Sequence, residues 1–291
     1  MTVRPAPSYA GKDFEGWGTS LVWFANATGD YPDEIRDRLA DMVFGDEGLN
    51  LNIARYNVGG GHAPDVQDYL RAGGAVEGWW NAPRGPPAPT STGGTRGPGR
   101  LERGRGRDPA LVGRPHQGRR RHVGDVQQLP PYFMTPNGYV SGSFNATDDQ
   151  LKTESIDDFA AYMVGVTERL EAAHGIEVGT IDPFNEPNTN YWRTTLGADG
   201  QPTGGRQEGA HMGPALQQKV ITALDSALQG ADTAAGIAAM DETNPGRSRR
   251  TGTPTRPTSR PRSTSSTSTR TARASAPRCA TSPRARARAC G

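Results

Sequence analysis

The chain has 291 residues, enough for one large domain or two small ones, and its net charge of +2 averages over parts of opposite charge. Residues 84–128 carry +7 and residues 247–291 carry +12, while the rest of the chain carries −17. Only two cysteines occur, which excludes a disulfide framework, and no apolar run of about 18 residues predicts a membrane span.

The first part of the chain, residues 1–83, predicts two strands separated by a helix. The apolar run at 17–25 suits a buried strand. Pro32 is favourable in the first turn of a helix, two acids follow it, and apolar residues recur at helical spacing as far as Gly45. The run at 49–58 predicts a second strand, which the glycines at 59–61 end.

Residues 129–246 continue the alternation of strand and helix. Strands are predicted at 131–135, 176–184 and 235–240, with amphipathic helices from Ile156 to Gly175 and from Pro214 to Gly230. Strands that alternate with helices predict βαβ units and a parallel sheet. We therefore predict an α/β fold, a partial (β/α)₈ barrel of about five of eight units. A doubly wound sheet is the alternative.

The stretches 84–128 and 247–291 differ from the rest in composition. The first is rich in Arg, Gly and Pro, and the second has no Leu, Ile, Val, Met, Phe, Trp or Tyr. Neither shows helix or strand periodicity, and the second cannot bury enough apolar surface to fold, so we expect both to be disordered. We interpret both as translation out of frame in GC-rich DNA. A genuine basic linker and tail is the alternative.

One segment carries a chemical signal: the run at 180–187 reads as a strand that ends in Asn185-Glu186-Pro187. Pro187 cannot donate to a sheet ladder, so the strand stops just after Glu186. In a parallel α/β barrel, catalytic residues lie at this end of the strands. Glu186 is therefore a candidate general acid for glycosidic cleavage, and Asn185 could bind a sugar hydroxyl. The structural alternative is that Glu186 caps the strand or forms a surface ion pair.

Three motifs occur in order: residues 16–25, residues 51–61 and residues 182–187. Together they resemble glycoside hydrolase family 30, close to its endo-β-1,6-galactanase-type members, over about 9–83 and 129–246. The resemblance implies a (β/α)₈ barrel with a β-sandwich side domain and a retaining mechanism. It implies Glu186 as the acid/base, and Arg55 as the strand-two Arg that orients the nucleophile or contacts substrate. The structural alternative for Arg55 is an ion pair at the barrel rim.

Further side chains at strand ends and in the loops after them are candidates for substrate binding. Aromatic rings can stack on sugar faces there, although core packing is the alternative for each ring. The candidates are Trp23, Trp80, Tyr191, Trp192 and His62. No cluster of His, Asp and Glu predicts a metal site, and we expect no cofactor.

The resemblance also implies a nucleophilic Glu at the end of strand seven, and no residue of this chain matches it. Glu242 follows the predicted fifth strand, which is the wrong position. We therefore predict a retaining glycoside hydrolase for β-linked galactan or a related glycan that is inactive as written. The alternatives are a non-catalytic damaged product and a polyanion-binding protein acting through its arginines.

The expected partner is a polysaccharide or oligosaccharide. We expect no nucleic-acid or membrane partner, because no aromatic residues interleave with the arginines and no recognition fold accompanies them. We expect a monomer. No basic-then-apolar segment at the N-terminus predicts a signal peptide, so the localisation stays open.

Overall fold

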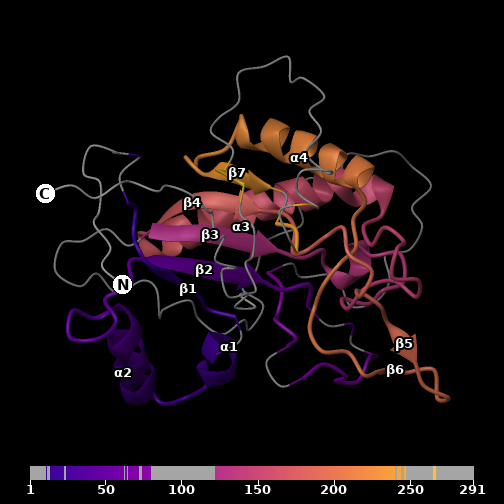
Figure 1. Ribbon diagram of the computed structural model, residues 1–291, viewed down its shortest axis with the longest axis horizontal. Helices are drawn as coiled ribbons and strands as arrows, with labels where there is room; N and C mark the ends of the chain where they lie inside the picture. The colour runs from indigo at the N-terminus through magenta and orange to yellow at the C-terminus, as the bar shows by residue number, and fades with distance from the viewer. Residues whose placement is uncertain are drawn as a thin grey trace, which may run out of the picture.

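The computed structural model describes residues 11, 14–22, 24–61, 63, 65–71, 74–79, 122–239, 241–243, 246 and 265–266. These residues form an α/β fold with one six-stranded parallel sheet, in the order β1-β2-β3-β4-β7-β8 (Figure 1). The strands are β1 Gly18–Ser20, β2 Ile53–Val58, β3 His122–Gln128, β4 Glu177–Asp182, β7 Gly236–Ala239 and β8 Ser265–Ser266.

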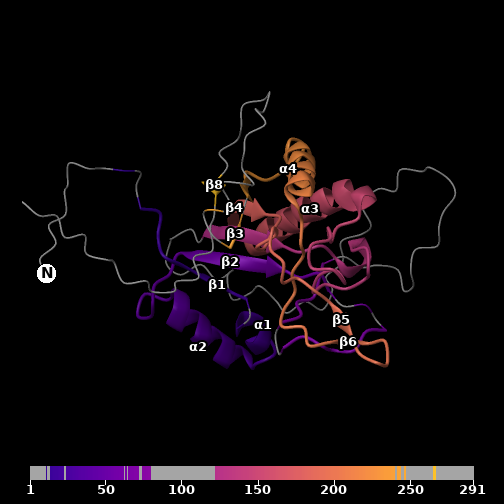
Figure 2. The same cartoon turned by 45° about the vertical axis from the view of Figure 1, so that its right-hand side comes forward.

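The order of the strands in the sheet is their order along the chain. Each strand pairs in parallel with the next, with Ile53 opposite His122 and Val123 opposite Val178. The described strands show no reversal of the kind that defines a doubly wound sheet. The carboxyl ends of β2, β3 and β4 therefore lie at one edge. The hairpin of β5 Thr195–Leu196 and β6 Pro202–Thr203 lies beyond that edge (Figures 1 and 2).

Local signals explain where the main helices begin and end. They are α1 Phe24–Thr28, α2 Asp33–Phe44, α3 Ile156–His174 and α4 Pro214–Leu228. Helix α3 ends because Gly175 adopts the left-handed conformation, with φ 60°, and donates its N–H to Glu171. Helix α4 begins with Pro214, whose missing N–H costs nothing in the first turn. The predicted helices are confirmed.

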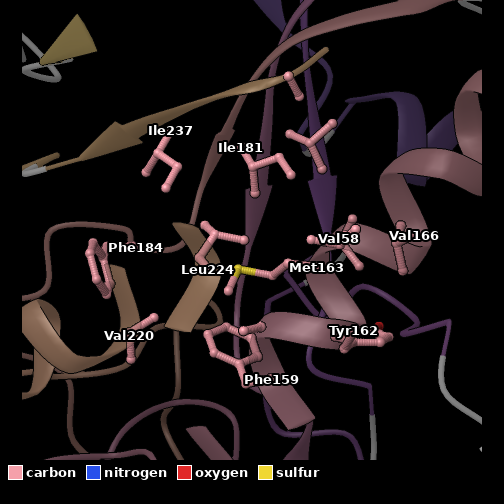
Figure 3. Packing of buried hydrophobic residues seen from close by; sticks show 14 of the residues in the cluster. Val58, Phe159, Tyr162, Met163, Val166, Ile181, Phe184, Val220, Leu224 and Ile237 are labelled. Atoms are coloured by element: carbon pink, nitrogen blue, oxygen red, sulfur yellow. The ribbon is translucent and has the colours of Figure 1, made fainter. Parts of the chain in front are cut away.

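The hydrophobic core lies between the sheet and helices α3 and α4. Figure 3 shows Phe159 and Met163 of α3 close to Leu224 of α4, with Ile181 and Ile237 of the sheet above them. All five are at most 5% exposed. Their positions recur on one face of each helix and inward along the strands, which is why α3 and α4 pack beside β4 and β7.

Phe159→Ala is expected to lower the free energy of unfolding by about 3–5 kcal/mol, because Phe159 is fully buried and its removal leaves a cavity. Urea unfolding followed by circular dichroism measures the change. Ile35→Ala on α2 is the matched control, since Ile35 is 46% exposed and its loss should cost under about 1 kcal/mol. Equal midpoints for the two variants would contradict this core.

One predicted strand is wrong in part and another is wrong altogether. The run at 17–25 forms only the short β1, and Phe24–Thr28 is helical because Ala25 donates its N–H back to Leu21. Residues 131–135 are not the third strand. They contain the 3₁₀ turn η2 Tyr132–Met134, which begins after Pro131, a residue that cannot donate to a ladder.

The third strand lies instead within the stretch 84–128, and the prediction of no strand there is wrong for residues 122–128. Gly124 and Asp125 interrupt the apolar pattern of β3, so the strand is not evident locally. It forms because both its edges are paired, with β2 and with β4. In the tail after Gly246, Ser265 and Ser266 pair with β7, so the tail is not wholly irregular. The rest of both stretches lies outside the described residues.

Loops at the carboxyl edge are tied to each other over long sequence distances. Glu208 donates its N–H to the carbonyl of Gly74, and Gly61 donates to Val76. Arg71 donates to the side chain of Gln207 at 3.0 Å. The loop after β2, residues 71 and 74–79, and residues 204–209 therefore form one connected layer of loops. No helix among the described residues is long and apolar enough to cross a membrane.

Candidate active site

Glu186 lies in the turn that follows β4, at the carboxyl edge of the sheet. The strand ends at Asp182, whose carboxylate accepts the N–H of Phe184 at 3.1 Å and so forms the first turn. Phe184 is buried in the core and anchors this turn. Asn185 and Glu186 follow and are partly exposed. This position matches the place expected for Glu186.

The backbone of Glu186 is in the left-handed region, with φ 47°. Its N–H donates to the carbonyl of Asp241 at 2.8 Å. Its carbonyl accepts the indole N–H of Trp192 and the hydroxyl of Thr189, each at 3.0 Å. The hydroxyl of Tyr191 donates to its carboxylate. A partly exposed carboxyl at the carboxyl ends of the strands can exchange a proton with a bound substrate.

Asp241, just after β7, links that strand to β2 and β3. Its carboxylate accepts the Arg55 guanidinium at 3.0 Å and the amide of Gln127 at 3.3 Å. The Asp241 side chain is 2% exposed and that of Arg55 is 23% exposed. Gln127 also donates to the carbonyl of Phe184 at 2.9 Å. Arg55 thus lies on β2, as expected, but at the third of its six residues rather than at its end, and it forms an ion pair there.

Asp241 and Gln127 were missed by sequence reasoning. The Asp241-Glu242 pair after an apolar run was a visible signal, but nothing in the sequence indicated which acid meets Arg55. Glu242 is fully buried, and one of its carboxylate oxygens accepts the side-chain amide of Gln217 at 3.5 Å.

The aromatic candidates are placed differently from one another. Tyr191 is 47% exposed, so one ring face remains accessible. Burial and the hydrogen bond to Glu186 raise the pKa of Tyr191 to about 12, so the hydroxyl keeps its proton at neutral pH. Trp192 is 5% exposed and packs inside the loop layer. It therefore has the packing role that was the alternative to sugar stacking. Trp23, Trp80 and His62 lie outside the described residues.

Glu208 is a buried carboxyl in the loop layer that sequence reasoning also missed. It is 3% exposed, and one carboxylate oxygen accepts the N–H of Val76 at 3.1 Å. Burial raises the pKa of Glu208 to about 8, although backbone N–H groups of Val76 and Gly60 favour the charged form. Glu208 is therefore mostly protonated at neutral pH and supports the loop after β2.

No group of three or more His, Cys, Asp and Glu side chains in the described part of the chain could hold a metal ion. His211 is buried, and its Nδ1 lies 2.6 Å from the carbonyl of Thr189. Its place is structural.

Comparisons with known proteins agree with this arrangement. The sequence profile of O-glycosyl hydrolase family 30 matches residues 114–251, so the match begins inside the basic stretch. The chain is 32% identical to an exo-β-1,6-galactobiohydrolase of Bifidobacterium longum subsp. longum, over 84% of this chain and 21% of that protein. It is 24% identical to an endo-β-1,6-galactanase of Hypocrea rufa, over 83% of this chain and 49% of that protein.

The fold is similar to that of a solved structure, the catalytic domain of family 30 xylanase C from Talaromyces cellulolyticus. The TM-score is 0.53 at 20% identity, over 82% of this chain and 49% of that chain. The chain thus spans about a fifth to a half of the lengths of these relatives. The ordered motifs, the parallel sheet and these similarities agree: residues 114–251 match glycoside hydrolase family 30, and the chain is similar to members of that family over most of its length.

Proposed function

We propose that the site is that of a retaining glycoside hydrolase for β-1,6-linked galactan or a closely related glycan, with Glu186 as acid/base, and that this chain lacks the nucleophile the full reaction needs. The observation that carries the proposal is the position of Glu186 just after the carboxyl end of β4. Hydrogen bonds fix both the N–H and the carbonyl of this residue. The two relatives named for β-1,6-galactan activity supply the substrate class.

In this proposal Glu186 gives its proton to the oxygen of the leaving sugar as the glycosidic bond breaks. Asn185, the neighbouring residue, contacts a sugar hydroxyl. Tyr191 places an exposed ring beside the carboxyl and offers a stacking face. Arg55 faces the same edge, with Asp241 holding its guanidinium in place.

The sheet is proposed to be part of a (β/α)₈ barrel. Sequential parallel strands, with helices α3 and α4 between strands β3, β4 and β7, are the repeating unit of such a barrel. About five of eight units can be assigned along this chain. A barrel also explains why catalytic candidates gather at one edge, since all strand ends face the same way.

The second carboxylate of a retaining pair is proposed to be missing from the chain as it stands. The two acids nearest the edge after β7 are engaged elsewhere: Asp241 pairs with Arg55, and Glu242 is fully buried. Neither occupies the family's strand-seven position. We therefore expect no measurable hydrolysis of galactan by this chain. A non-catalytic product remains the second candidate, because of this missing group.

Azide rescue tests the proposal. With a 4-nitrophenyl β-1,6-galactobioside, azide should attack the anomeric carbon from the face opposite the aglycone. The C–O bond breaks, and nitrophenolate leaves without help from an acid. The product should be the α-glycosyl azide. With β-1,6-galactotriose the leaving sugar needs the Glu186 proton, so Glu186→Gln should cut that rescued rate about 100-fold or more.

Product stereochemistry separates the outcomes. A β-glycosyl azide would mean that azide intercepts a covalent intermediate, so a nucleophile is present after all. Hydrolysis without azide that Glu186→Gln abolishes would overturn the missing nucleophile but keep Glu186. Rescued cleavage of galactotriose that is equally fast in Glu186→Gln would overturn the acid assignment. Absence of any azide product would favour the non-catalytic candidate.

A further inference from the structure

The backbone of Glu186 is unusual for its residue type. Among the described residues other than glycine, only Asn50 and Glu186 have positive φ. The left-handed region crowds Cβ against the backbone, and Asn tolerates it better than Glu does. A glutamate adopts this conformation only where the surrounding structure holds it there. Particular neighbouring side chains must therefore hold Glu186 in the left-handed conformation.

Two side chains hold the carbonyl of Glu186. The indole N–H of Trp192 and the hydroxyl of Thr189 both donate to it at 3.0 Å. On the other side, the Glu186 N–H donates to the backbone carbonyl of Asp241. Both peptide units that flank the Glu186 Cα are therefore fixed, and with them the direction in which its Cβ points.

Trp192 has little freedom to move. A Cβ at Gly209 would lie 2.1 Å from the Trp192 ring, and one at Gly142 would lie 2.2 Å from the Trp192 carbonyl carbon. Gly209 thus lets neighbouring backbone pack directly on the indole, and Gly142 lets it pack on the Trp192 main chain; the residue is 5% exposed. A ring confined in this way keeps its N–H aimed at one acceptor.

Thr189 is also anchored. It is 3% exposed, and its carbonyl lies 2.6 Å from the Nδ1 of His211. The neighbouring Pro187 carbonyl accepts the N–H of Met212 at 2.9 Å. The turn at 187–192 is therefore bound to the loop before α4, and it cannot shift without disturbing that loop.

We propose that Trp192 and Thr189 are positioning residues that hold Glu186 in the left-handed conformation and so aim its carboxyl at the leaving-group oxygen. The effect of these two residues on catalysis rests on the proposed function of Glu186, whereas their effect on the backbone conformation of Glu186 does not. Trp192 thereby acts through Glu186 rather than as a surface for sugar stacking.

The effect of Trp192 and Thr189 on the backbone conformation of Glu186 is tested by protein stability, without measuring activity. In the otherwise unchanged chain, Glu186→Gly should unfold at higher urea concentration than Glu186→Ala, because glycine alone accepts positive φ freely. In a Trp192→Phe/Thr189→Val background the turn can relax, so the difference should shrink or vanish. Equal urea midpoints for Glu186→Gly and Glu186→Ala in the otherwise unchanged chain would overturn the proposal. So would a Gly–Ala difference that is undiminished in the Trp192→Phe/Thr189→Val background.

The matched control is Trp79→Phe/Thr167→Val. Trp79 is 7% exposed and donates its indole N–H to Tyr56 at 3.2 Å, and Thr167 is fully buried and donates to Met163 at 2.9 Å. This variant removes the same two donor types away from Glu186. It should leave the Gly–Ala difference at position 186 intact. Loss of that difference in the control would overturn the assignment to Trp192 and Thr189.

The effect of Trp192 and Thr189 on catalysis is tested by azide rescue with two substrates that differ in their leaving groups. Trp192→Phe/Thr189→Val should slow cleavage of β-1,6-galactotriose about 10- to 100-fold in kcat, with KM little changed, because a misplaced acid cannot reach the leaving oxygen. Cleavage of the 4-nitrophenyl substrate, which needs no acid, should change less than about twofold. Equal losses on both substrates would mean general damage and overturn the proposal.

Failure of the proposed function is recognised separately. If Glu186→Gln cleaves galactotriose as fast as the unchanged chain, or no substrate yields an azide product, Glu186 is not the acid. The proposed effect of Trp192 and Thr189 on catalysis is then overturned as well. The comparison of Gly and Ala at position 186 still decides whether Trp192 and Thr189 hold the turn.

Discussion

Asp241→Ala is expected to lower the free energy of unfolding by about 3–5 kcal/mol, because it leaves the Arg55 guanidinium without its buried partner. It also removes an acceptor of the Gln127 amide. Strands β2 and β3 and the end of β7 lose their common contact. For a domain whose total stability is about 5–15 kcal/mol, this is a large share.

Urea unfolding at neutral pH measures the effect. Asp33→Ala is the matched control: Asp33 also pairs with an arginine, Arg36, but its side chain is 79% exposed. An exposed pair of this kind contributes about 0–1 kcal/mol. If both substitutions cost the same, the Asp241 cluster does not hold the strands together.

The second large effect concerns pH. Because burial raises the pKa of Glu208 from 4.5 to about 8, the folded state binds one more proton than the unfolded state between those values. The stabilising contribution of the protonated group is complete below about pH 4.5. It is lost as pH rises through 8, at up to about 1.4 kcal/mol per unit. The total loss is on the order of 3–5 kcal/mol.

Glu208→Gln is the decisive variant, since glutamine keeps the size and the acceptor for the Val76 N–H but cannot ionise. The stability of Glu208→Gln relative to the unchanged chain should increase from pH 5 to about pH 8 and level off by pH 9. Glu177→Gln, at an exposed carboxyl on β4, controls for the removal of a charge and should show little trend. Parallel pH curves for the unchanged chain and Glu208→Gln would contradict a protonated Glu208.

The helices were predictable because their signals are local. Pro32, Gly175 and Pro214 mark helix ends through backbone geometry that each residue brings with it. The strand β3 was not predictable, because it depends on β2 and β4, which come from distant parts of the chain. Its own residues alternate too weakly to indicate a strand.

The same division applies to the candidate site. The sequence by itself determined the family, the α/β class and Glu186 as the candidate acid, since a short run ending in Asn-Glu-Pro encodes both a strand end and a carboxyl. Only the tertiary structure decided that Arg55 meets Asp241, 186 residues away, that Trp192 is buried beneath Glu186, and that Glu208 is enclosed and protonated. These facts depend on burial and on contacts between remote segments, which local residue patterns do not encode.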